Sequence, residues 1–201
     1  TREAAKHLGI DIKSATVAVQ GFGNVGSVSA DLIAQLGAKI VAVTDWKGGV
    51  YNKAGLDITK MLEFVKQHKT IDGFPGGEPL DNQDLFGLDV DVLIPAALEN
   101  QITMENAPKI KAKIVTEGAN GPTTPDAHRH LHERGVFVIP DILANAGGLT
   151  GSYFEWVQDR YGYFWTEEEV NTRLETKMVE AFSDVLENAL KHKVDMRTGA
   201  Y

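Results

Sequence analysis

Three glycines with the spacing GxGxxG are the part of the sequence with the clearest chemical meaning. Gly21, Gly23 and Gly26 follow the apolar run VAVQ and precede helix-compatible sequence. Glycines so placed let the chain turn tightly, let the backbone approach a pyrophosphate and let the new helix pack close to the sheet. The free N–H groups and the positive dipole end of that helix then face the phosphates. We therefore predict a dinucleotide contact over the whole turn, which also includes Phe22, Asn24 and Val25.

An acid stands about 20 residues beyond the glycines, where a dinucleotide-binding turn requires one. Asp45 ends the apolar run KIVAVTD, and its carboxylate can accept hydrogen bonds from the adenosine ribose hydroxyls. A carboxylate there would also repel a 2′-phosphate, which favours NAD over NADP. Two alternatives stay open: Asp45 suits any turn as a cap, and Lys47 could hold a 2′-phosphate. The cofactor is NAD or NADP, with NAD slightly favoured.

Small and amide residues follow two later apolar runs. Ala96 and Ala97 come after VDVLIP, and Asn120 closes the run KIVTEGAN. Because open α/β sheets bind ligands at the carboxyl ends of their strands, these residues are candidates for cofactor contact. An asparagine side chain can both donate and accept hydrogen bonds, which suits a ribose hydroxyl or a carboxamide. Asn145, which precedes Ala-Gly-Gly, is a second candidate of this type. Ordinary turn or capping roles are the alternatives for both asparagines.

The elements that must position these residues alternate between strand and helix. The predicted strands are 16–20, 39–45, 90–95, 113–117 and 136–140, with helices over 24–36, after Asp57 and from Thr124 to Gly135. This alternation predicts an α/β fold, a doubly wound, mostly parallel Rossmann-type sheet with helices on both faces. Val25, Val28, Leu32 and Leu36 form the apolar stripe of helix 24–36, and the Gly- and Pro-rich stretch 70–79 is expected to be a surface loop.

The last part of the chain, residues 145–201, is predicted to be helical. Thr166 and Glu169 have the spacing of a capping box, and they open a long amphipathic helix that runs through Lys191. An aromatic group precedes this helix, and we interpret it as core or interface: Trp156, Tyr161, Tyr163, Phe164 and Trp165.

Composition excludes several classes of function. The chain has 28 acidic and 20 basic residues and a net charge of −8, so neither nucleic acid nor an acidic membrane surface is an expected partner. It has no cysteine, which rules out disulfides and thiolate metal sites, and we expect a cytoplasmic protein. His128 and His132 would share one helix face, with His130 between them, but no third ligand is evident and we predict no metal site.

Five phrases give the sequence a specific resemblance to glutamate dehydrogenases: GFGNVG, PAALENQIT, EGANGPTTP, PDILANAGG and SYFEWVQD. The resemblance implies reversible oxidative deamination of L-glutamate to 2-oxoglutarate and ammonium, with a nicotinamide cofactor. It assigns the glycines and Asp45 to adenosine and pyrophosphate, Asn120 and Asn145 to the nicotinamide end, and the hydroxyl of Ser152 to the side-chain carboxylate of the substrate. Trp46 replaces a residue that is small in most relatives, so it could crowd or stack on the adenosine.

The resemblance also implies what is missing. The catalytic lysine and aspartate of the family belong to an N-terminal domain that no stretch here matches, so we expect no catalytic residue in this chain. Residues 1–201 would form a single dinucleotide-binding domain, with 145–201 as its C-terminal helical segment, and the full-length enzyme would be a homohexamer. The alternatives are a leucine- or phenylalanine-type dehydrogenase, which would carry an apolar residue at Ser152, and a non-catalytic nucleotide sensor.

Overall fold

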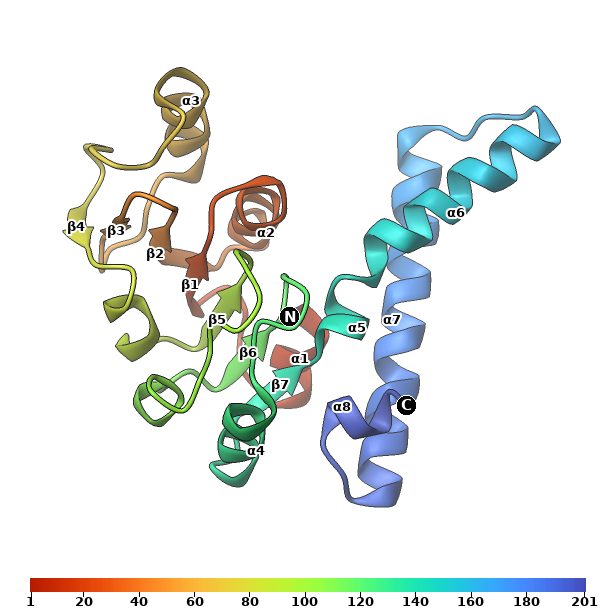
Figure 1. Ribbon diagram of the computed structural model, residues 1–201. Helices are drawn as coiled ribbons and strands as arrows, with labels where there is room; N and C mark the ends of the chain where they lie inside the picture. The colour runs from red at the N-terminus through yellow and green to blue at the C-terminus, as the bar shows by residue number, and fades with distance from the viewer.

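The computed structural model describes all residues 1–201 and contains one seven-stranded sheet (Figure 1). The spatial order of its strands is β4-β3-β2-β1-β5-β6-β7. The strands are β1 Thr16–Gln20, β2 Lys39–Thr44, β3 Gly49–Tyr51, β4 Glu78–Leu80, β5 Val92–Pro95, β6 Ile114–Thr116 and β7 Phe137–Ile139. The chain runs from β1 to β2 on one side and returns to β5 on the other side of β1. The carboxyl ends of β1 and β5 therefore form the point at which the strand order reverses, where such sheets bind ligands.

Five strands are parallel, as the alternating sequence predicts: β1, β2, β5, β6 and β7. The short strands β3 and β4 extend one edge in the antiparallel direction. We did not predict this edge, and β4 lies partly in the stretch that we expected to be a loop. Three residues per strand are too few for a periodic signal. The strands form because β3 pairs with β2 and β4 pairs with β3, which satisfies their backbone groups.

Helices cover both faces of the sheet. The α-helices are α1 Arg2–His7, α2 Asn24–Gln35, α3 Ile58–His68, α4 Pro125–Glu133, α5 Asp141–Ala144, α6 Ala146–Tyr161, α7 Glu167–His192 and α8 Met196–Gly199, and the 3₁₀ turns are η1 Asp84–Gly87 and η2 Ala107–Lys109. One core layer joins α1, α2, α3 and α7 to the sheet through residues such as Val17 and Val19. The other joins α4, η1 and η2 through residues such as Ala18. Alternate residues of β1 thus enter opposite cores, as expected for a strand that is buried on both faces.

The apolar stripe that we identified on α2 does not pack on the sheet. Val25, Val28 and Leu32 are each about half exposed, whereas Gly26, Ala30 and Ile33 form the buried face. The reason is the glycine turn, because Gly26 must face the carbonyl of Gly21 for α2 to start close to β1. That requirement rotates the helix and leaves the stripe in solvent.

The helices α5 to α8 follow the sheet and lie beside it. Figure 1 shows α6 and α7 crossing to the side of the sheet, with their connection far from the strands. The predicted capping box of Thr166 and Glu169 is present at the start of α7. The short helix α8 folds back against α7 and contacts β7. Four aromatic side chains near the α6–α7 connection are exposed and so do not belong to the core, namely Trp156, Tyr161, Tyr163 and Phe164.

Candidate functional site

The glycine turn between β1 and α2 is shaped by close backbone contacts. A Cβ atom on Gly26 would lie 1.8 Å from the carbonyl oxygen of Gly21, and one on Gly21 would lie 2.8 Å from that of Ala96. Gly21 also has a φ of +89°, which favours glycine. A Cβ on Gly23, in contrast, would meet nothing within 4 Å. Gly23 is the N-cap of α2 without any capping side chain, so the first turn of the helix is open to a ligand.

Two pockets lie at the carboxyl ends of the strands and share one loop. The first, which we call the Asp45 pocket, has a volume of about 660 Å³ and contains five predicted residues in addition to the shared loop: Gly21, Phe22, Gly23, Asp45 and Trp46. The second, the Asn120 pocket, has about 610 Å³ and contains Val25, Asn120 and Asn145. Ala96 and Ala97, which follow β5, line both pockets. A molecule with two halves could therefore occupy both while its centre passes the glycine turn.

Asp45 is held by four hydrogen bonds within the chain. Its Oδ1 accepts from the amides of Lys47 (2.8 Å) and Gly48 (3.2 Å). Its Oδ2 accepts from the Thr70 hydroxyl (2.7 Å) and the Ile71 amide (2.8 Å). Since a carboxylate has about four lone-pair sites, these four donors fill its capacity to accept hydrogen bonds. These contacts are those of the turn interpretation that the sequence left open, and they tie the loop after β2 to the end of α3.

The lysine beside Asp45 points to another acid. Lys47 Nζ lies 2.8 Å from Asp72 Oδ2, and both side chains are about half exposed. The hydrogen bond to Asp72, together with its negative charge, raises the pKa of Lys47 above its ordinary value. In this arrangement the ammonium group is engaged by a protein carboxylate at the rim of the Asp45 pocket.

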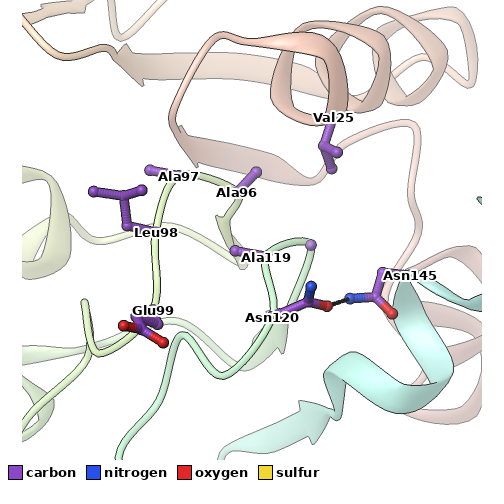
Figure 2. Close-up of a pocket in the computed structure, with 9 residues that line it drawn as sticks. Val25, Ala96, Ala97, Leu98, Glu99, Ala119, Asn120 and Asn145 are labelled. Atoms are coloured by element: carbon purple, nitrogen blue, oxygen red, sulfur yellow. Dashed lines mark hydrogen bonds between the residues drawn. The ribbon is translucent and has the colours of Figure 1, made fainter.

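The two asparagines predicted at the far end of the site meet in the Asn120 pocket (Figure 2). Asn145 Nδ2 donates to Asn120 Oδ1 over 2.6 Å, although 25 positions separate the residues. The loop that carries Asn120 is also fixed at its other end, because the amides of Gly118 and Ala119 both donate to the carbonyl of Pro95. Figure 2 shows the two amide side chains directed toward one another across the pocket, opposite Val25.

Three predicted residues line neither pocket: Asn24, Gly26 and Ser152. Gly26 acts in the turn itself, as its contact with Gly21 shows. Ser152 is exposed in the second turn of α6, beyond Asn145 along the chain. Phe22 lines the Asp45 pocket, but its side chain is buried in the core, which leaves its backbone as the group available to a ligand.

Sequence reasoning missed polar groups of the Asp45 pocket. Gln20 Oε1 and Asn82 Oδ1 are buried there without a hydrogen-bond partner. Gln20 stands directly before the glycine motif, so its position could have drawn attention, whereas Asn82 arrives from a distant loop and donates to the carbonyl of Asp45. Buried acceptors without partners are rare and call for an explanation. A ligand with N–H or O–H groups would satisfy them, so this pocket and the open glycine turn together fit a dinucleotide.

An ion cluster adjoins the loop of the Asn120 pocket, because Glu117 directly precedes Gly118, which lines the pocket. Glu117, which directly follows β6, is fully buried, and its Oε2 lies 2.5 Å from Arg197 Nη2. Arg197 Nη1 lies 3.0 Å from Asp141 Oδ1. Burial lowers the pKa of Arg197, but attraction to both carboxylates outweighs it and the net shift is upward. Burial raises the pKa of Asp141, yet hydrogen bonds from the amides of Gly121 and Ile142 and the charge of Arg197 together lower it.

The histidines of α4 do not form a metal centre in this structure. No group of three or more His, Cys, Asp or Glu side chains is placed to hold a metal ion. His128 instead directs its Nε2 to Asp195 Oδ1 at 3.1 Å. Separately, no helix has the length and apolar character needed to cross a membrane.

The fold and the glycine turn define a Rossmann-type α/β domain. Its family follows from comparison with known proteins, since the model of the Glutamate/Leucine/Phenylalanine/Valine dehydrogenase family matches residues 1–201. The chain therefore belongs to this family, and the resemblance noted from the sequence is confirmed.

Several similar proteins are named glutamate dehydrogenases. The chain is 56% identical to the glutamate dehydrogenase of Thermotoga maritima, over 96% of this chain and 47% of the relative. It is 49% identical to the NAD-specific glutamate dehydrogenase of Clostridioides difficile, over 100% of this chain and 49% of the relative. The hetero-hexameric glutamate dehydrogenase of Thermus thermophilus, crystallised with leucine, superposes with a TM-score of 0.93 at 36% identity, over 99% of this chain and 47% of that one. The chain thus spans about half the length of the relatives it matches.

Proposed function

We propose that this chain is the dinucleotide-binding domain of a glutamate dehydrogenase, which deaminates L-glutamate oxidatively to 2-oxoglutarate and ammonium. The observation that carries the proposal is the pair of pockets that share Ala96 and Ala97 beside the open glycine turn. Membership of the family supports the proposal, and so do the names of the relatives. Several of these relatives are named NAD-specific glutamate dehydrogenases. When bound, NAD or NADP would supply the hydride acceptor.

Each part of the site has a proposed role. The turn at residues 21–26 would hold the pyrophosphate, the Asp45 pocket the adenosine, and Asn120 and Asn145 the nicotinamide end. Because the protein already satisfies the oxygens of Asp45, we propose that Asp45 selects the cofactor mainly through its negative charge and through the shape of its loop. Trp46 is 79% exposed beside it and offers a face on which an adenine could stack.

The reaction needs groups that this half does not supply in a recognisable arrangement. Deamination requires a base with a perturbed pKa next to the reacting carbon. No lysine or acid lines the Asn120 pocket except Glu99, whose side chain is exposed. We therefore propose that the catalytic lysine and aspartate lie in the other half of a longer chain, and that the assembled enzyme is a homohexamer.

Calorimetric titration of this polypeptide with NAD and NADP tests the proposal. We expect binding of the dinucleotide, tighter for NAD, and no glutamate turnover by the polypeptide alone. Replacement of Asp45 by Ser should bring the affinities for NAD and NADP closer together, because the charge that repels a 2′-phosphate is lost. Failure to bind either dinucleotide would overturn the assignment, and deamination by the isolated chain would overturn the proposed division of labour.

The choice of substrate depends on Ser152. An exposed serine at this point of α6 can donate a hydrogen bond to a carboxylate, whereas a relative selective for leucine or phenylalanine would need an apolar side chain there. In the full-length enzyme, Ser152→Val should raise KM for glutamate and improve turnover of aliphatic amino acids. Unchanged glutamate kinetics would favour the leucine- or phenylalanine-type alternative.

A further inference from the structure

Arg197, near the C-terminal end of the chain, joins two strand ends that lie far from it in sequence. From α8 its guanidinium reaches Glu117 after β6 and Asp141 after β7. It is the only cation paired with either carboxylate in the chain. The two acids are also joined directly, because the Asp141 amide donates to Glu117 Oε2 over 2.8 Å.

Asp141 carries this connection to both asparagines of the Asn120 pocket. Its Oδ2 accepts from the amide of Gly121, the residue after Asn120, over 2.8 Å. Its carbonyl accepts from the amide of Asn145 over 3.0 Å. One residue therefore fixes the backbone on both sides of the Asn120–Asn145 hydrogen bond, and Arg197 fixes that residue.

The burial of Glu117 shows why the arginine is needed. A fully buried carboxylate is costly unless a charge and hydrogen bonds compensate it. Its second oxygen, Oε1, has no partner at all, so its only compensation comes from Arg197 and the Asp141 amide at Oε2. Without Arg197, the carboxylates of Glu117 and Asp141 would have no cation between them, and like charges repel. The loops would have to separate to relieve that repulsion.

We propose that Arg197 is a positioning residue that aligns Asn120 and Asn145 for the second half of the dinucleotide, acting through Glu117 and Asp141. Arg197 itself does not line the Asn120 pocket. The effect on cofactor binding rests on the proposed function, whereas the effect on the loops does not.

The test uses the full-length enzyme with Arg197→Met, and Arg129→Met as the matched control. Arg129 is an exposed arginine on α4 whose ion pair with Asp126 lies at the surface. Two ligands probe the two halves of the site separately, because NAD contains the nicotinamide and ADP-ribose lacks it. We expect Arg197→Met to weaken NAD binding about tenfold, which corresponds to about 1.4 kcal/mol, with ADP-ribose affinity unchanged. Arg129→Met should leave both affinities unchanged.

Amide hydrogen exchange measures the loops without reference to activity. In Arg197→Met, peptides that contain residues 118–121 and 141–145 should exchange faster, while the glycine turn at 21–26 exchanges as before. Arg197→Lys keeps the charge but not the two-pronged fork, so it should recover part of the protection and part of the NAD affinity. If Arg197→Met does not fold, Arg197→Lys carries the same comparison with a smaller expected change.

The outcomes separate the two proposals. Unchanged exchange in both loops, or an equal loss of NAD and ADP-ribose affinity, would overturn the positioning role. A wild-type enzyme that binds neither ligand would overturn the proposed function, while faster exchange in the variant would still support the connection from Arg197 to the loops. In a double-mutant cycle, Arg197→Met should weaken NAD binding much less when Asn120 is already Ala.

Discussion

Two acids directly follow parallel strands of the same sheet, and they are satisfied in different ways. Asp45 after β2 accepts from three backbone amides and one hydroxyl, all neutral donors. Glu117 after β6 is deeper and depends on the charge of Arg197, which is 80 positions away. The carboxylate held by neutral donors joins the loop after β2 to the end of α3, whereas the one neutralised by a remote cation joins the end of β6 to the C-terminal helix α8. The position of an acid in a fold therefore does not define its role.

The largest expected effect is on Glu117, because its removal leaves Arg197 partly buried with one partner lost. Glu117→Leu should lower the free energy of unfolding by about 3 kcal/mol in a urea titration of this chain. The control is Glu175→Leu, which removes an exposed acid that also pairs with an arginine, Arg2. A loss no greater than that of the control would contradict the comparison.

Removal of the other acid should cost less, since no charge is left unpaired. Asp45→Ala deprives several neutral donors of their acceptor, and we expect a loss of about 2 kcal/mol. Thr70→Val removes a single donor to Asp45 and should cost about 1 kcal/mol in the same titration. If Asp45→Ala destabilised the chain more than Glu117→Leu, the ranking of the two acids would be reversed.

A third acid extends the comparison to low pH. Asp195 is hydrogen-bonded to the Thr198 amide and hydroxyl and to His128, and these contacts outweigh burial and lower its pKa from 3.8 to about 2. The contribution of the ionised Asp195 side chain to the stability of the fold is therefore complete above about pH 4 and is lost as the pH falls toward 2. Asp195→Asn should lower stability at pH 6 by about 1 kcal/mol, after solvent screening, and flatten the acid limb of the stability profile. An acid limb that is identical in the variant would show that Asp195 does not contribute to it.

The smallest effect is expected at the exposed pair beside Asp45. Lys47→Ala removes the ion pair with Asp72, and we expect no measurable change in the urea midpoint because both groups are screened by solvent. The same variant sharpens the cofactor question in calorimetry. A selective loss of NADP affinity would show that Lys47 leaves Asp72 to hold a 2′-phosphate, and unchanged affinity would support its role as a surface pair.

Local patterns in the sequence predicted most of the fold. The runs that became β1, β2, β5, β6 and β7 are apolar because both faces of a parallel sheet are buried. Caps and stops such as Asp57, Thr166 and Gly135 were readable because their effect depends on a few neighbouring residues. The antiparallel edge of β3 and β4 was missed, because its pairing partner rather than its own composition makes it a strand.

The candidate site was predictable in part. The glycine turn, Asp45, Ala96 and Asn120 were predicted as candidates because strand ends in such a sheet converge on one edge, and Asp45, Ala96 and Asn120 do line the two pockets. The partners Asn82, Glu117 and Arg197 were not, because their importance arises from burial and contact and not from spacing. The orientation of α2 was also not predictable. The apolar stripe dominates the hydrophobic periodicity of the helix, but the close contact of Gly26 with Gly21 decides which face is buried.

The sequence by itself determined the class of fold, the position of the glycine turn and the family. These depend on residue types at short, fixed spacings, which can be recognised without knowledge of the tertiary contacts. Only the tertiary structure decided that the oxygens of Asp45 are satisfied by neighbouring loops, that two pockets share Ala96 and Ala97, and that Arg197 pairs with both Glu117 and Asp141. Those facts depend on which distant groups are brought together in a medium of low dielectric constant, where an acid must find its partners wherever the packing has placed them.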